Sequence, residues 1–135
     1  MASGVKCDPK CIDDFNEMKL RKTHRYIIYH IKNESEITIL EKGNREATYA
    51  DFQQTLMDAM NSGEGRYAVY DYEMDNKNCA LIFVVWTPSA IGVRSRMLYA
   101  SSKDAIKRKL VGIKRCLEAN DPDEIEEQEM RSLVC

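Results

Sequence analysis

The sequence lacks the features that mark membrane, secreted and disulfide-rich proteins. None of its apolar runs approaches the roughly 20 residues that a membrane-spanning helix needs, and the longest, residues 80–86 (ALIFVVW), has the length of a strand. The first residues, MASGVKCDPK, lack the apolar stretch of a secretory signal. We therefore expect a cytoplasmic protein with reduced thiols.

The cysteines show no metal-binding pattern. They are odd in number and include no C-x-x-C pair: Cys7, Cys11, Cys79, Cys116 and Cys135. On a helix, Cys7 and Cys11 would share one face, but no second pair of Cys or His follows at the spacing of a zinc site. Packing is the better interpretation of all five, so we expect neither a metal nor a cofactor.

Catalytic motifs are also absent. The chain contains no Walker loop, no G-x-S-x-G and no H-E-x-x-H, and residues 63–65 (GEG) are too short to cradle a pyrophosphate. Its only two histidines, His24 and His30, would share one face of a strand, with no nucleophile near them in sequence. We expect a protein that is not an enzyme.

The three prolines all fall at expected element boundaries. Asp8 and Pro9 predict the start of a helix that ends near Lys19, Pro88 breaks the chain with Gly92, and Pro122 begins a last helix with an acidic first turn. Further helices are expected at 48–61 and 93–110, and strands at 25–31, 36–41, 66–72, 80–86 and 113–119. The first two strands form a hairpin around Asn33, and the last strand is a short edge strand.

This order of elements predicts one domain over residues 1–135. The fold class is α/β of the α+β type, with a mixed, mainly antiparallel sheet of about five strands sandwiched between helices. We expect the core to span residues 6–133, with residues 1–5 as a flexible tail.

Charge is unevenly distributed along a chain whose net charge is only −2. Residues 93–115 carry eight basic side chains and one acid, whereas residues 116–135 carry seven acids and one base. The helix at 93–110 buries Leu98, Tyr99 and Ile106 on one side. Its opposite side has a small apolar centre at Val93 and Met97 inside a basic frame, which is typical of a protein interface.

A basic helix is also the usual footprint of nucleic-acid binding. The isoelectric point of about 5.7 and the inward position of Tyr99, the only aromatic residue of the helix, argue against it. A phosphoinositide- or nucleic-acid-binding module that uses residues 93–110 remains the alternative function, although no nucleic-acid partner is expected.

Several segments resemble the actin-depolymerising factor/cofilin family. They are MASGV, KLRKTHRYIIYHI, RYAVYD, FVVWTPSA, RSRMLYASSKDAIKRKL and GIKRCLEAN, in the family's order and over nearly the whole chain. The resemblance implies the ADF-homology (gelsolin-like) fold and a monomeric, cytoskeleton-associated protein. That protein would bind actin monomers, preferably in the ADP form, as well as filaments, and would promote filament depolymerisation, severing and turnover.

The resemblance also assigns contact residues. On the monomer-binding face they are Ser3, Gly4, Val5, Arg94, Arg96, Met97, Ser101, Lys103, Asp104, Lys107 and Arg108. The family's filament contacts correspond to Lys77 and Arg131, although the loop at 73–79 is shorter than in long animal members and the short protist forms are more similar. Ser3 is the candidate for regulatory phosphorylation, and Lys103, Lys107, Arg108 and Lys109 are candidates for phosphoinositide binding.

Overall fold

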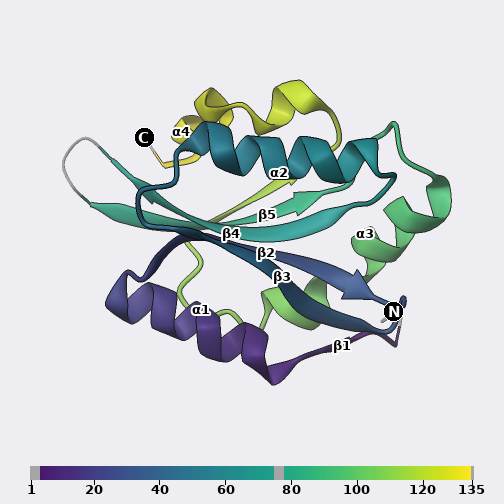
Figure 1. The fold of residues 1–135 in the computed structure, drawn as a ribbon, viewed down its shortest axis with the longest axis horizontal. Helices are drawn as coiled ribbons and strands as arrows, with labels where there is room; N and C mark the ends of the chain where they lie inside the picture. The colour runs from purple at the N-terminus through teal and green to yellow at the C-terminus, as the bar shows by residue number, and fades with distance from the viewer. Residues whose placement is uncertain (1–3, 75–77, 135) are drawn as a thin grey trace.

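The computed structural model describes residues 4–74 and 78–134, which form a sheet covered by helices on both faces (Figure 1). Within these residues the sheet has six strands in the order β1-β3-β2-β4-β5-β6. The strands are β1 (Lys6–Cys7), β2 (His24–Lys32), β3 (Glu36–Asn44), β4 (Arg66–Glu73), β5 (Cys79–Trp86) and β6 (Arg115–Ala119). The expected mixed sheet is confirmed, with one strand more than the sequence predicted.

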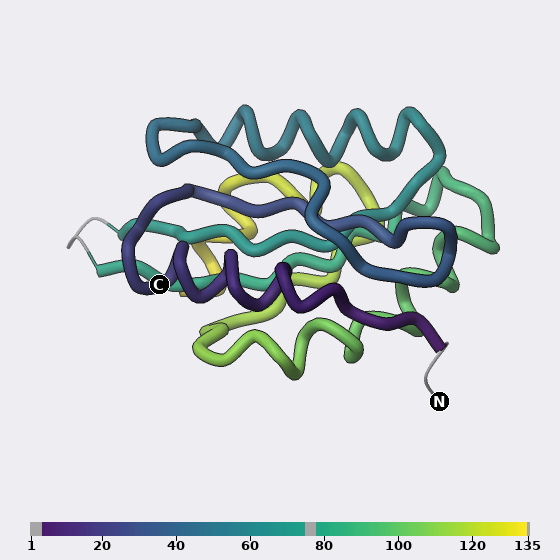
Figure 2. Tube along the Cα trace, turned by 60° about the horizontal axis from the view of Figure 1, so that its bottom comes forward, coloured from purple at the N-terminus to yellow at the C-terminus, as the bar shows by residue number. Residues whose placement is uncertain are grey.

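Each face of the sheet has its own hydrophobic core. Helices α1 (Pro9–Arg21) and α3 (Val93–Lys107) lie side by side on one face, as Figures 1 and 2 show. The opposite face carries α2 (Tyr49–Asn61), the 3-10 turn η1 (Pro122–Ile125) and α4 (Glu127–Val134). Strand β5 is buried along nearly its whole length, as its apolar sequence predicts.

Strand pairing explains the position of α3. The strand pairs β2–β3, β2–β4 and β4–β5 are antiparallel, whereas β6 runs parallel to β5. Parallel neighbours need a long crossover connection, and here α3 lies within that connection. The predicted edge strand is therefore confirmed as β6. Its pairing with β5 holds the C-terminal end of the connection that contains α3.

The N-terminal segment joins the core earlier than the sequence suggested. Strand β1 pairs in parallel with β3, with Lys6 opposite Glu36 and Cys7 opposite Ile37. Val5, which we assigned to a flexible tail, is 7% exposed and packs in the core between α1, α3 and the sheet. The other expected tail residue that the structure describes, Gly4, is exposed.

The ends of three helices differ from the prediction. Helix α1 continues to Arg21 and closes with Lys22 in the left-handed conformation, and α3 ends at Lys107 rather than at residue 110. The last helix is interrupted at Glu126, whose backbone is extended, so a separate turn η1 precedes α4. Asp121 and Glu124 form a capping box at the start of η1.

The start of α2 is where the sequence predicted it. The Thr48 side chain accepts a hydrogen bond from the Asp51 backbone, and the Asp51 carboxylate accepts one from Thr48 in return. Among the residues described, no helix has both the length and the apolar character needed to cross a membrane.

Candidate functional site

Helix α3 has the two faces that its sequence predicts. Tyr99, Ser102 and Ile106 are buried against the sheet. The opposite side is exposed along the helix at Val93, Met97, Ala100, Ser101 and Asp104. This outward face of α3 is the candidate site.

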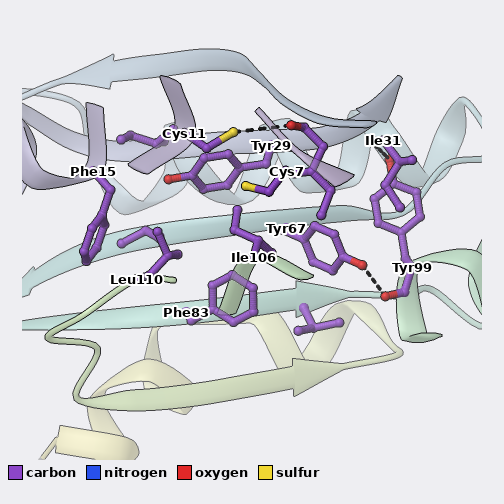
Figure 3. Packing of buried hydrophobic residues seen from close by; sticks show 14 of the residues in the cluster. Cys7, Cys11, Phe15, Tyr29, Ile31, Tyr67, Phe83, Tyr99, Ile106 and Leu110 are labelled. Carbon is purple, nitrogen blue, oxygen red and sulfur yellow. Dashed lines mark hydrogen bonds between the residues drawn. The ribbon is translucent and has the colours of Figure 1, made fainter. Parts of the chain in front are cut away.

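Tyr99 anchors α3 to the sheet through its side-chain hydroxyl and its backbone carbonyl (Figure 3). Its hydroxyl oxygen accepts a hydrogen bond of 2.9 Å from the Ile31 amide, and its carbonyl accepts one from the Tyr67 hydroxyl. Burial raises the pKa of both tyrosines, so both hydroxyls stay protonated. A Cβ at Gly65 would lie 3.0 Å from the Tyr99 ring and 2.8 Å from the Trp86 carbonyl, so glycine permits this close approach.

The centre of the outward face is apolar. Val93 is 59% exposed and Met97 64%, and they lie one helical turn apart. Val93 was placed on this face by the sequence but was not assigned as a contact residue. Together the two side chains provide the apolar patch that a protein partner can bury.

Arg94 is held in place by an acid from another element. Its Nε and Nη2 atoms donate to the two carboxylate oxygens of Glu34 at 2.9 and 2.6 Å. The hydrogen bonds lower the pKa of Glu34 and raise that of Arg94, so the pair stays charged. Arg96, two residues further on, is half-buried and forms no ion pair with any residue that the structure describes.

The turn that carries Glu34 also binds the N-terminal segment. Asn33 and Glu34 both have positive φ in the three-residue connection between β2 and β3, where the Ser35 amide donates to the Lys32 carbonyl at 3.0 Å. Next to them, the Ser35 carbonyl accepts a 3.0 Å hydrogen bond from the Lys6 amide. The turn thus brings Gly4 and Val5 toward the start of α3, whereas Ser3 lies outside the described residues.

The far edge of the outward face is basic but partly engaged. Lys103 donates a 2.8 Å hydrogen bond to Glu118 of β6, which raises its pKa, and Lys107 interacts with the Cys116 thiol. The Arg108 Nε donates to the Asp104 carbonyl at 3.1 Å, and Lys109 is exposed. Of the four candidate phosphoinositide ligands, Lys103 and Lys107 therefore lie in the last turns of α3, and Arg108 and Lys109 directly follow its end.

The candidate filament surface is on the other face of the sheet. The Arg131 Nε donates to the Tyr72 hydroxyl at 3.2 Å, and its Nη2 lies 3.9 Å from the Glu127 carboxylate. Lys77 lies outside the described residues. Arg131 is thus tied to its own chain, and acids surround it on α4.

No metal site is evident among the residues that the structure describes, because none of their His, Cys, Asp and Glu side chains gather in groups of three or more.

Sequence reasoning missed two acids at the site. Glu34 and Glu118 hold Arg94 and Lys103, although 60 and 15 residues separate the members of each pair. Only the acidic character of the two residues was visible in the sequence, since the pairing depends on how the hairpin and the edge strand pack beside α3.

Taken together, the fold and the site define a small protein with a mixed sheet between helices, in which α3 has an exposed face that is partly apolar and partly basic. Residues 4–135 match the family described as "Cofilin/tropomyosin-type actin-binding protein". The chain belongs to this cofilin/ADF family of actin-binding proteins.

Two relatives illustrate the similarity. "Actin-depolymerizing factor 8" of Arabidopsis thaliana is 41% identical over 129 residues, which cover 92% of this chain and 89% of the relative. "Cofilin" of Gibberella zeae is 37% identical over 136 residues with the same coverage. Among solved structures, cofilin of Streptomyces griseoflavus superposes with a TM-score of 0.86 at 31% identity, covering 98% of this chain and all of that one.

Proposed function

We propose that this protein binds actin subunits through the outward face of α3 and the adjoining N-terminal segment, and thereby promotes filament disassembly. The family of the chain and the names of its relatives support actin as the partner. The alternative main function, a phosphoinositide- or nucleic-acid-binding module that uses residues 93–110, is not favoured. We further propose that the protein acts at the cytoskeleton as a monomer without catalytic activity.

The observation that carries this proposal is the composition of the outward face. Met97 and Val93 form an exposed apolar centre, with Arg94 and Arg96 beside it. A flexible methionine adapts to an apolar cleft, while arginines make bidentate contacts with carboxylates at its rim. We assign the same contact role to Gly4, Ser101, Lys103, Asp104, Lys107 and Arg108. Val5 packs in the core, so we expect it to position the N-terminal segment rather than to touch the partner.

Three assays test the function. In co-sedimentation with filaments, the protein shifts actin from the pellet to the supernatant, and in a pyrene-actin assay it accelerates the loss of polymer. Titration of labelled monomers gives tighter binding to ADP-actin than to ATP-actin. Unchanged filaments together with no binding to monomers would refute the proposal.

Binding along the filament is proposed to use Lys77 and Arg131. Because Arg131 is engaged by Tyr72 and Glu127, we expect this surface to contribute less than α3. An Arg131→Ala variant should keep its monomer affinity and lose part of its filament affinity, which separate titrations of monomers and filaments would measure.

Phosphorylation of Ser3 is proposed as an off switch. Three residues further on, Lys6 is hydrogen-bonded to the turn whose Glu34 holds Arg94. A phosphate in this region would add two negative charges to a surface that binds acidic partners. Ser3→Asp should weaken actin binding while Ser3→Ala preserves it, and equal affinities of the two variants would contradict the switch.

Phosphoinositides are proposed as competing ligands at the C-terminal end of α3. Arg108 and Lys109 are exposed there, and Lys103 and Lys107 lie in the preceding turns of the helix. Anionic headgroups attract such clusters by roughly 1 kcal/mol per basic residue. Vesicles that contain a phosphoinositide should bind the protein and displace actin, and an Arg108→Ala/Lys109→Ala variant should bind them less; equal binding to neutral vesicles would exclude this ligand.

A further inference from the structure

A groove lies between α2 and η1, on the face of the sheet opposite α3 (Figure 1). Its lining includes Ala50 and Met57 of α2 on one side, and Pro122, Asp123 and Glu126, at and just after η1, on the other. Met57 is partly buried and packs against the core of this face, whereas Asp123 and Glu126 are exposed. The groove therefore combines apolar side chains with an acidic rim.

The elements that form the groove carry charge of one sign only. Residues 48–61 and 120–130, which contain α2 and η1, have eight acidic side chains and no lysine or arginine. Opposite charges across an interface guide two proteins into one orientation and exclude partners of the wrong sign. A partner that fits this groove therefore brings basic side chains on either side of an apolar one.

The outward face of α3 has this complementary composition. Residues 93–109 carry six basic side chains and one acid. Val93 and Met97 are exposed along the middle of the face, and helical spacing places Arg96 on one of its edges and Arg108 on the other. The flexible side chain of a methionine adapts to an irregular groove. The molecule thus carries both halves of a contact on opposite sides of its sheet.

We propose that the groove between α2 and η1 is the docking site for the outward face of α3 from a second copy of this chain. In this contact, Met97 of one copy packs beside Met57 of the other. The arginines on the two edges of α3 lie opposite Asp123 and Glu126. An amphipathic helix held in a groove is a common mode of recognition between proteins.

The contact joins two different surfaces, so it is head-to-tail. Each copy that donates its α3 still has an empty groove, and each copy whose groove is filled still has a free α3. Because the two surfaces lie on opposite faces of the sheet, such a contact builds open chains rather than a closed dimer. Association also covers α3, so the monomer remains the form that binds actin. This last consequence rests on the proposed function, whereas the association does not.

Sedimentation velocity tests the association without actin, with a reductant present so that no disulfide joins the copies. At about 0.01 M salt, where the Debye length is about 30 Å, the average sedimentation coefficient of the wild-type chain should rise with concentration and show no plateau at the dimer. The rise should largely disappear at about 0.5 M salt, because screening weakens the attraction. A chain that stays monomeric at low salt would overturn the proposal and leave a basic segment of another protein as the partner of the groove. A closed dimer would also overturn it.

Charge reversal identifies the two surfaces. Asp123→Lys with Glu126→Lys should abolish self-association, and so should Arg96→Glu with Arg108→Glu. An equimolar mixture of the two variants should form a one-to-one dimer that does not grow, because it contains one intact α3 and one intact groove. A mixture that stays monomeric while the wild-type chain associates would show that the contact lies elsewhere.

A matched control separates the groove from net charge. Asp13→Lys with Glu17→Lys makes the same change in charge on the exposed side of α1 and should associate as the wild-type chain does. An equal loss in this control would overturn the groove as the contact. Circular dichroism checks that each variant is folded, and the salt dependence of the wild-type chain decides on self-association without any variant.

Discussion

Helices α3 and α4 lie on opposite faces of the sheet and differ in what they show to the solvent. Each buries side chains in its own core, Ile106 from α3 and Met130 from α4. The outward face of α3 has two exposed apolar residues among bases, whereas α4 presents acids and one arginine that contacts Tyr72 and Glu127. Burial therefore holds both helices in the fold, and only the outward residues of α3 have the composition of a binding surface.

The largest expected effects come from removing a buried side chain, because both helices are held in the fold by burial. Ile106→Ala and Met130→Ala should each lower the free energy of unfolding by about 2–5 kcal/mol, because both side chains are fully buried. Urea denaturation followed by circular dichroism measures the change. A loss below about 1 kcal/mol in either variant would mean that the helix is held by other contacts.

The next prediction concerns actin binding, in which the two helices should differ. Arg94→Ala combined with Arg96→Ala should weaken actin-monomer binding by more than about a hundredfold, because two arginines that pair with carboxylates of the partner are lost together and arginine is enriched among the residues that dominate binding energy. Stability should change little, since neither residue belongs to the core. Arg131→Ala on α4 is the control, and a similar loss in that variant would remove the distinction between the two faces.

A smaller effect tests the apolar centre of α3. Met97→Ala should weaken monomer binding about tenfold, corresponding to about 1.4 kcal/mol, whereas Met97→Leu should restore most of the affinity. The loss should persist at high salt, because burial of apolar surface is not screened. A defect that disappears as salt rises would show that charge alone drives binding.

The smallest effect concerns the acid that holds Arg94. Glu34→Gln removes a negative charge from the basic face and releases Arg94, so the affinity for actin monomers should rise. The expected rise is only about twofold to fivefold, because exposed ion pairs are weak. Glu41→Gln, on the exposed part of β3, is the matched control. Weaker binding by the Glu34 variant would instead show that the pair pre-positions Arg94 for its partner.

Elements with a local signal were predictable from the sequence. The Thr48 cap, the turn at Asn33 and the apolar periodicity around Tyr99 each specify structure within a few residues. Strand β1 was missed because two residues have no periodicity and are defined only by pairing with Glu36 and Ile37. The break at Glu126 was missed because Pro122 fits the first turn of either an α-helix or a 3-10 turn.

The candidate site was predictable in outline and not in its contacts. The exposed positions of Met97, Ser101 and Asp104 follow from helical spacing, and the structure places all three on the outward face. The partners of Arg94 and Lys103 depend on long-range packing, which no short stretch of sequence specifies. The contact residues themselves come from the family resemblance.

The crossover position of α3 has a consequence for its dynamics. The helix connects β5 to β6, and its Tyr99 is bonded to two central strands. Detaching α3 would break these bonds and disturb the parallel pair, so the amide hydrogens of α3 and β6 should exchange with solvent through one common opening event. The backbone of α3 is therefore ordered before a partner binds. The conformational entropy lost on binding comes mainly from the exposed side chains.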